Sequence, residues 1–311
     1  MSLPTLLTTR LTDLLGADYD SVMRAFSHDR VASFRINTLK STSFEVEAFL
    51  TREGFPITRV DGFEGVYLLP REDEYRFKGL DLFRSGKIYM QSLSSMIPAL
   101  ALTPKSGMQI LDVCAAPGSK TTQIAALTKN SAEIVALEQS PVRYEKLLHN
   151  LALQGATSVE AIRSEALKYL RETETEFDAI LLDVPCSAEG RIRLSNEKTY
   201  GFWSLENTHR KAVLQTELLT AALGRLKVGG RLVYSTCTLA PEENEGVIEQ
   251  VAQSGISFTL ESLQLPPCYT RSIRPGKSPT NQTSDLDFTR SIRVLPSEMT
   301  EGFFVGVILK R

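Results

Sequence analysis

The stretch Leu111-Asp-Val-Cys-Ala-Ala-Pro-Gly118-Ser-Lys-Thr121 joins a short apolar strand pattern to a helix pattern through small residues. Small side chains at such a junction let the backbone approach a ligand closely, at the carboxyl edge of an α/β sheet. The spacing matches neither the GxGxxG fingerprint nor the GxxxxGK[ST] phosphate loop. The stretch therefore predicts an open α/β sheet and disfavours a dinucleotide or ATP as its ligand.

Strand and helix patterns alternate after this junction, which is typical of a doubly wound α/β domain. The strand Ala179-Ile-Leu-Leu182 is entirely apolar, as expected for a parallel sheet covered on both faces. The predicted strands cover 108–114, 133–138, 159–164, 177–185, 231–237 and 302–309, and the predicted helices cover 121–127, 141–154, 207–226 and 242–253. Residues 264–297 are rich in proline and are predicted to form a long loop, in which Thr-Arg-Ser-Ile-Arg occurs at 270–274 and again at 289–293.

The first quarter of the chain has a different pattern. Residues 1–26 have helical periodicity with a break near Gly16. A strand at 32–37, a helix at 43–54 and strands at 58–60 and 66–69 follow. The charged stretch 71–76 is taken as the boundary, so we predict an N-terminal α+β domain over 1–75 and an α/β domain over 76–311.

Composition places the chain among ordinary globular proteins. It has 311 residues, of which 42% are hydrophobic and 23% charged, and the formal net charge is −2. No apolar run approaches the ~18–20 residues that span a bilayer, and no secretory signal is visible. Four cysteines without a CxxC pair and three scattered histidines predict neither a disulfide framework nor a metal site. We expect a cytoplasmic monomer without metal, on which any basic surface for nucleic acid is local.

The second strand of the predicted sheet ends in Ala136-Leu-Glu138. An acidic residue at this place, about 20 residues after the loop glycine, can accept hydrogen bonds from ribose hydroxyls. An adenosine site without a pyrophosphate loop indicates S-adenosylmethionine. The alternative for Glu138 alone is a solvated carboxylate.

Two cysteines follow the ends of later strands, in Leu182-Asp-Val-Pro-Cys186 and in Tyr234-Ser-Thr-Cys237. If these strands are neighbours in a parallel sheet, their ends lie roughly 5 Å apart. Both cysteines would then face one cleft, with Asp183 beside them. An isolated cysteine is more often a small buried hydrophobic residue, and Cys114 and Cys268 are interpreted in that way from their spacing.

Several motifs together resemble the Sun/nucleolar-protein family of RNA cytosine-C5 methyltransferases. They are Phe34-Arg-Ile-Asn37-Thr-Leu-Lys40, Met90-Gln91, the 112–120 loop, Asp183-Val-Pro-Cys-Ser187, Ser235-Thr-Cys-Thr-Leu-Ala-Pro-Glu-Glu-Asn-Glu245 and Glu301-Gly-Phe-Phe304. The resemblance runs in order over nearly the whole chain from about residue 30. Departures from the family pattern are Ala188 after the Pro-Cys motif, Ser119 before Lys120, and Glu165 where an aspartate is usual.

The resemblance implies a Rossmann-like class I methyltransferase domain behind a small RRM-like domain. It further implies that Cys237 is the nucleophile, that Cys186 assists product release, and that Asp183 and Lys120 are catalytic. The implied S-adenosylmethionine site consists of Cys114, Ala115, Ala116, Pro117, Gly118, Ser119, Lys120, Glu138, Arg143, Glu165 and Asp183.

The chemistry of cytosine methylation needs such groups. Addition of a thiolate to C6 makes C5 nucleophilic enough to attack a methyl sulfonium, and a base must then remove the C5 proton. The target cytosine in rRNA or tRNA must be unpaired or flipped. Two other functions are considered: an RNA-binding ribosome-assembly factor without catalysis, and a methyltransferase acting on DNA or a small molecule. In a DNA-type enzyme Cys186 would be the attacking residue.

Candidates for RNA contact come from basic and aromatic side chains. Arg35, Asn37, Lys40, Arg84, Lys87, Arg191 and Arg193 are candidates for phosphate contacts, with solvated surface charge as the alternative. Tyr200, Phe202 and Trp203 are candidates for stacking on a base, with a place in the hydrophobic core as the alternative. The RNA itself is not identified by these residues.

Overall fold

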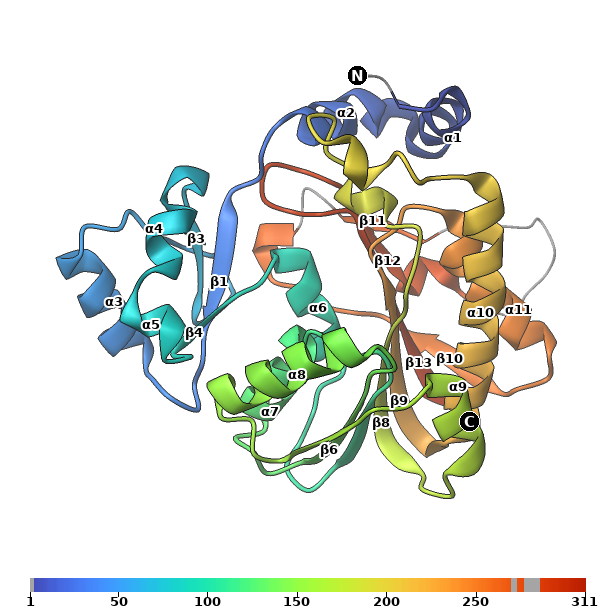
Figure 1. The fold of residues 1–311 in the computed structure, drawn as a ribbon. Coiled ribbons are helices and arrows are strands. Elements are labelled where there is room, and N and C mark those ends of the chain that lie inside the picture. The colour runs from blue at the N-terminus through green and yellow to red at the C-terminus, as the bar shows by residue number, and fades with distance from the viewer. Residues whose placement is uncertain (1–2, 270–272, 277–285) are drawn as a thin grey trace.

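Two sheets organise the chain in a computed structural model, which describes residues 3–269, 273–276 and 286–311. The small sheet has the strand order β2-β3-β1-β4. Among the described residues the large sheet has the order β11-β12-β13-β9-β8-β5-β6-β7, and β10 pairs with β13 outside this path. Figure 1 shows the small sheet with its helices as a lobe beside the large sheet.

The large sheet is mixed. Strands β5 to β9 run parallel to their neighbours, whereas β13 is antiparallel to β9 and continues into antiparallel β12, β11 and β10. The predicted α/β fold is confirmed. The strands are β5 (Gln109–Asp112), β6 (Glu133–Leu137), β7 (Val159–Ile162), β8 (Phe177–Asp183), β9 (Leu226–Thr236), β10 (Phe258–Glu261), β11 (Ile273–Pro275), β12 (Ile292–Val294) and β13 (Phe303–Lys310).

Helices cover both faces of this sheet because its strand residues alternate between two cores. Ile110 and Leu181 face one core, which α6, α7 and α8 complete, whereas Leu111 and Leu182 face a second core under α9, α10 and α11. The helices are α6 (Leu93–Ala101), α7 (Ser119–Leu127), α8 (Pro141–Gln154), α9 (Ala166–Glu172), α10 (Leu205–Gly224) and α11 (Glu245–Gln253). Helix α8 begins at a proline and ends at Gly155, whose φ of 68° closes the helix in the left-handed conformation.

The prediction of a continuous loop over 264–297 is wrong in part. Strand β12 pairs with β13, and β11 pairs with β12 in a register that places Arg274 opposite Arg293. The two copies of Thr-Arg-Ser-Ile-Arg therefore contribute to neighbouring strands, although 270–272 of the first copy lie outside the described residues. Strands of three residues have too little periodicity to be predicted alone; β13 pairs with β12, and β12 in turn pairs with β11.

The N-terminal helices α1 (Thr5–Leu15) and α2 (Tyr19–Ser27) are joined by a short 3₁₀ turn at Gly16–Asp18, as the break near Gly16 predicts. They pack against the large unit rather than the small sheet. Leu7, Leu11 and Phe26 share a core with Trp203 and Leu295. Figure 1 shows both helices above the edge of the large sheet that carries β11 and β12.

The small unit has the order β1, α3, β2, β3, α4, α5, β4. It includes residues beyond the boundary expected at 75, because β4 pairs with β1 in antiparallel register. Helix α3 starts with a capping box between Thr42 and Glu45. The elements are β1 (Ala32–Ile36), α3 (Ser43–Arg52), β2 (Thr58–Arg59), β3 (Val66–Leu69), α4 (Glu74–Lys78), α5 (Asp81–Arg84) and β4 (Ile88–Met90).

Arg35 fixes the small sheet to the large unit. Its Nε donates to Gln91 Oε1 at 2.8 Å, and its Nη2 donates to Thr122 Oγ1 at 2.8 Å and to the Ser119 carbonyl at 3.2 Å. Burial lowers the pKa of Arg35 to about 10, and its guanidinium also lies 5.0 Å from the ring centroid of Tyr89. Since Ser119 and Thr122 belong to the first turn of α7, this arginine joins the small sheet to the loop 112–120.

Replacing Arg35 by alanine should lower the free energy of unfolding by about 2–4 kcal/mol, because buried partners lose their donor. Arg52 is the matched control, since its side chain is 71% exposed and its ion pair with Glu53 is a surface pair. Arg52→Ala should cost less than about 0.5 kcal/mol. Urea unfolding of both variants measures the difference, and equal midpoints would contradict the structural role of Arg35.

Candidate functional site

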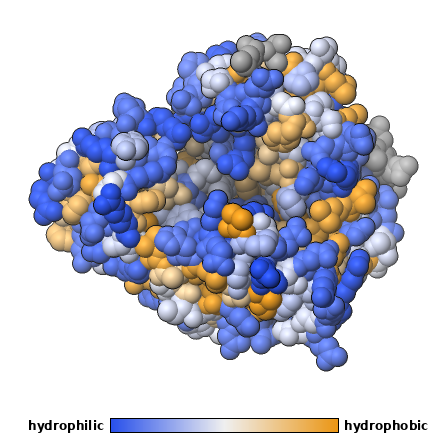
Figure 2. Space-filling view, in the orientation of Figure 1, coloured by the Kyte–Doolittle hydropathy of each residue, from blue (hydrophilic) through white to orange (hydrophobic). Residues whose placement is uncertain are grey.

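The carboxyl ends of β5, β6, β8 and β9 surround a cleft of about 940 Å³. The end of β4 supplies a further wall through Tyr89, Met90 and Gln91. Figure 2 shows this side of the molecule hollowed between the lobe of the small unit and the large unit. The residues expected to bind the cofactor line the cleft, except Ala115 and Gly118: they are Cys114, Ala116, Pro117, Ser119, Lys120, Glu138, Arg143, Glu165 and Asp183.

Gly118 shapes the loop that enters this cleft. Its φ of 100° is in the left-handed region that glycine tolerates, and it stands directly before the first turn of α7. The preceding strand ends in buried Asp112, which accepts a 2.6 Å hydrogen bond from Thr121 Oγ1. Burial raises the pKa of Asp112 to about 6. The carboxyl group therefore braces the loop from behind rather than facing the cleft.

Glu138 lies at the edge of the cleft, where its side chain is almost fully buried. Its Oε1 accepts from the Ser140 amide at 2.8 Å, and its Oε2 lies 3.2 Å from Arg143 Nη1. Arg143 in turn donates to the Ala116 carbonyl at 2.6 Å. These contacts hold the carboxylate in one orientation while it lines the cleft.

Lys120 and Ser235 contact Asp183 at the end of β8, and Ser95 contacts Lys120. Lys120 Nζ lies 2.6 Å from Asp183 Oδ2 and donates to Ser95 Oγ at 3.0 Å. Ser235 Oγ donates to Asp183 Oδ1 at 2.7 Å. Asp183 and Ser235 are opposite each other in the parallel register of β8 and β9. Ser95 and Ser235 were not among the predicted site residues; the strand register indicates Ser235, and no local pattern indicates Ser95.

Cys186 and Cys237 meet at the floor of the cleft, as their places after neighbouring strands predict. Their Sγ atoms are 3.3 Å apart. The pKa of Cys186 is raised well above its ordinary value, most strongly by the contact with Cys237 and next by burial. The nearby Arg191 lines the same cleft, and its pKa is raised chiefly by Glu301 and further by the two cysteines. Arg191 thus places a positive charge on the cleft that the two sulfur atoms line.

The other two cysteines occupy different surroundings. Cys114 lines the cleft within the loop 112–120, and burial raises its pKa. Cys268 packs at the margin of the core formed by α6, α7 and α8. All four cysteines are free thiols.

A buried polar layer lies behind the loops that carry Cys186 and Cys237, and the sequence analysis did not predict it. Glu243 accepts from the Ser187 amide at 3.0 Å and from Gln215 Nε2 at 2.8 Å. Burial raises the pKa of Glu243 to about 7. Glu243 belongs to the motif that contains Cys237, whereas Gln215 lies inside α10 without any motif around it.

Three candidates for RNA contact instead hold the small unit in place. Arg35 is buried as described, and Asn37 Nδ2 donates to the carbonyls of Gly86 and Gln154 at 2.8 and 2.7 Å. Lys40 Nζ donates to the carbonyls of Ser85 and Leu153. Arg35 and Asn37 are buried, whereas Lys40 is exposed and reaches these two carbonyls from the surface.

The remaining candidates divide between surface, cleft and core. Arg84 is exposed and Lys87 is half-buried, Arg191 lines the cleft, and Arg193 pairs with Asp29 at 3.3 Å. Among the aromatic candidates, Tyr200 and Trp203 are buried in a core, and Trp203 Nε1 donates to Glu189 at 2.8 Å. Phe202 is 56% exposed.

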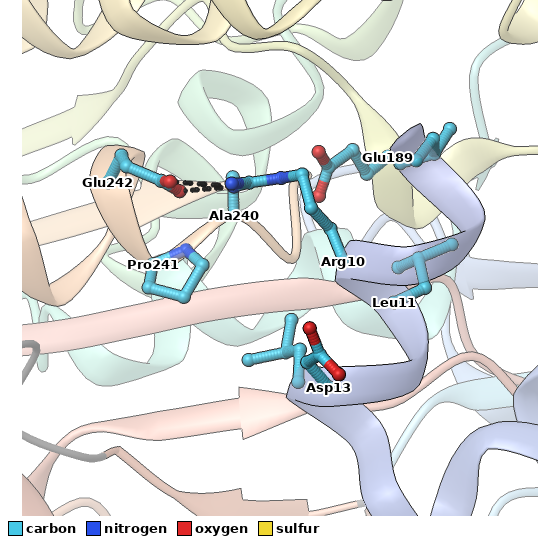
Figure 3. A pocket seen from close by; sticks show the side chains of 9 residues that line it. Arg10, Leu11, Asp13, Glu189, Ala240, Pro241 and Glu242 are labelled. Carbon is cyan, nitrogen blue, oxygen red and sulfur yellow. Dashed lines mark hydrogen bonds and ion pairs between the residues drawn. The ribbon is translucent and has the colours of Figure 1, made fainter. Parts of the chain in front are cut away.

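A second cavity of about 300 Å³ lies between α1 and the segment Ala240-Pro241-Glu242 (Figure 3). Arg10 Nη2 lies 2.7 Å from both carboxylate oxygens of Glu242. Leu7 and Leu11 line the same cavity. The contacts connect the first helix to the segment directly before Glu243.

No helix in the described part of the chain is long and apolar enough to cross a membrane. No group of three or more histidine, cysteine, aspartate or glutamate side chains in residues 3–269, 273–276 and 286–311 is placed to hold a metal ion.

Comparison with known proteins assigns the family. The family model described as 16S rRNA methyltransferase RsmB/F matches residues 99–309. The chain is 42% identical over 241 residues to ribosomal RNA small subunit methyltransferase F of Aeromonas hydrophila, covering 74% of this chain and 50% of that protein. It thus spans about half the length of this relative. It is 36% identical over 283 residues to tRNA (cytosine(49)-C(5))-methyltransferase of Pyrococcus abyssi, covering 89% of this chain and 88% of that protein.

A solved structure has a similar fold. The methyltransferase homolog protein from Pyrococcus horikoshii superimposes with a TM-score of 0.85 at 32% identity, over 99% of this chain and 95% of that one. The resemblance inferred from the motifs is confirmed. Since the family model matches more than half of the chain, the protein belongs to the 16S rRNA methyltransferase RsmB/F family.

Proposed function

We propose that this protein transfers a methyl group from S-adenosylmethionine to C5 of a cytosine in RNA, with Cys237 as the nucleophile. The observation that carries the proposal is the pair of sulfur atoms, 3.3 Å apart, on the cleft that Glu138 and Asp183 also line. The relatives named above support RNA as the substrate, and their names divide between rRNA and tRNA. The proposal therefore covers both rRNA and tRNA.

The residues of the cleft suit S-adenosylmethionine. Four acidic side chains line the cleft, Glu138, Glu165, Asp183 and Glu301, and the first three suit a ligand that carries ribose hydroxyls, an ammonium group and a sulfonium. When bound, this cofactor supplies an electrophilic methyl group. Glu138 would accept from the ribose hydroxyls, and the loop 114–120 would face the rest of the ligand.

Cys237 would begin the reaction by adding its thiolate to C6 of the cytosine. Arg191 lines the same cleft and would place a positive charge near the attacking sulfur. Asp183 would contact the N3/N4 edge of the base, oriented by Lys120 and Ser235 as described. After C5 has been methylated, the thiolate form of Cys186 would take the C5 proton and become a thiol, while the bond between C6 and Cys237 breaks and Cys237 leaves as a thiolate.

The small unit is proposed to be RRM-like and to contribute to RNA binding. Its order β1, α3, β2, β3, α4–α5, β4 and its sheet order β2-β3-β1-β4 support a split βαβ arrangement. The face of this sheet that carries Arg35 contacts α7, so any RNA contact would use other surfaces of the unit. The end of β4 lines the cleft and would lie beside the target nucleotide.

The two cysteines should fail in different ways when replaced by alanine. Cys237→Ala should form neither adduct nor product, because the attacking sulfur is gone. Cys186→Ala should accumulate a covalent protein–RNA adduct, because attack and methyl transfer remain possible while elimination is impaired. Denaturing gels with labelled RNA measure this difference.

The reverse pattern would identify Cys186 as the nucleophile and favour the DNA-type reaction. Methyl transfer to total RNA, DNA and free cytidine, measured in parallel with tritiated cofactor, separates these substrates. Absence of transfer to all three would favour the RNA-binding assembly factor without catalysis.

Replacing Glu138 by glutamine should weaken S-adenosylmethionine binding by about tenfold or more. A charge-assisted hydrogen bond is worth about 1.5–3 kcal/mol, and 1.4 kcal/mol corresponds to a tenfold change in Kd. Calorimetry with the cofactor alone measures this effect. Glu160→Gln, an exposed position on β7, is the control and should bind as the wild type does. Unchanged affinity in Glu138→Gln would remove Glu138 from the cofactor site.

A further inference from the structure

Two buried side chains hold the peptide groups on either side of Cys186. Gln215 Nε2 donates to the carbonyl of Pro185, the residue before the cysteine, at 3.0 Å. Glu243 accepts from the amide of Ser187, the residue after it, at 3.0 and 3.2 Å. The same Nε2 donates to Glu243 Oε2 at 2.8 Å, so the two side chains also bind each other.

The orientation of each group in this cluster is determined by its neighbours. The Gln215 amide nitrogen faces two acceptors, a carbonyl and a carboxylate, which uses both of its hydrogens. Tyr234 Oη lies 2.5 Å from the Glu243 carbonyl oxygen and 3.3 Å from Gln215 Oε1. Gln215, Glu243 and Tyr234 are all 0% exposed. A fully buried polar cluster with its bonds satisfied is rigid, because any displacement leaves a polar group unpaired.

A second set of bonds connects the loop of Cys186 to the loop of Cys237. Ser187 Oγ and Thr238 Oγ1, on the residues directly after the two cysteines, are 2.7 Å apart. The Gly190 amide donates to the Cys237 carbonyl at 3.0 Å. The two loops are thus bonded to each other, and the peptide groups on either side of Cys186, which follows the last residue of β8 by three positions, bond in addition to Gln215 and Glu243.

We propose that Gln215 and Glu243 are positioning residues for Cys186, which hold its sulfur where it removes the C5 proton and allows the product to leave. The inference rests on the proposed function and extends it to two residues outside the cleft. Packing alone does not need these groups, since apolar side chains of similar volume fill a buried site without the cost of desolvating a carboxylate. The polar pair is directed at the two peptide groups that flank the cysteine.

The test compares Gln215→Leu and Glu243→Gln with the wild type and with Cys186→Ala. Leucine fills the space of Gln215 without its two hydrogen bonds. Glutamine at 243 presents an amide to two donors and loses one acceptor. Both variants should accumulate protein–RNA adduct on denaturing gels. Steady-state turnover should fall about 10–100-fold, as for a catalytic group displaced by about 1 Å, while the first turnover keeps its rate.

Thr216→Ala is the matched control, because Thr216 is next to Gln215 on α10 and its side chain bonds only to Ala212 and Gln250. It should release product at the wild-type rate. The amplitude of the first turnover counts the folded active sites in each sample, so a variant that folds poorly still reports its rate of release.

Adding Gln215→Leu to Cys186→Ala should cause no further loss, because both changes act on the same step. A merely structural role would slow the first turnover too and would make the two losses additive, and either result would overturn the proposal. Normal release in both single variants would also overturn it. If Cys186→Ala itself forms no adduct, the covalent mechanism fails first, so the two failures are distinguishable.

Discussion

The parallel register of β8 and β9 is the constraint on which the site depends. It places Asp183 opposite Ser235, and each strand ends within three residues of its cysteine. Neighbouring strands lie about 5 Å apart, so two cysteines separated by 51 positions come within 3.3 Å of each other. A slip of one residue would turn every side chain of the strand to the opposite face. The contact between Ser235 and Asp183 would then be lost together with the sulfur pair.

Ion pairs lie around the ends of β8 and β9. Lys120 is buried and neutralises Asp183, while Arg191 stands near the sulfur atoms and pairs with Glu301 at 3.7 Å. An unpaired buried charge would be costly, and the buried Lys120 has Asp183 as its partner, whereas the Arg191 side chain is 60% exposed. Glu138 pairs with Arg143 at 3.2 Å at the edge of the cleft. Acidic side chains thus line the part of the cleft where a cationic cofactor is proposed to bind, and Arg191 lines the same cleft as the two sulfur atoms.

The small unit contributes side chains to the wall of the cleft. Its sheet contacts the first turn of α7 through Arg35, and Asn37 and Lys40 bind backbone carbonyls at the end of α8. These contacts bring Tyr89 and Gln91 to the wall of the cleft. The segment Phe34–Lys40 therefore has a structural role at an interface. That role fixes the geometry of the cleft without contacting the reacting atoms.

The sequence alone predicted what local pattern and motif determine. Alternating strands and helices identified the α/β unit, the small residues of 112–120 identified the ligand loop, and two Cys motifs after apolar strands identified the sulfur pair. The order of the strands was an assumption that only the tertiary structure settled. The structure also decided the contacts of the basic side chains: the buried Arg35 bonds to Thr122, 87 positions away, and the exposed Lys40 bonds to the Leu153 carbonyl, 113 positions away.

The same reason explains Gln215, Ser95 and β12. A glutamine inside a helix, a serine in another and a three-residue strand have no periodicity or motif that distinguishes them. Gln215 acquires its role from Pro185, 30 positions away, Ser95 from Lys120, 25 positions away, and β12 from its pairing with β13. The local sequence pattern indicates the burial and hydrogen bonding that one segment needs. Only the folded chain decides which distant group provides them.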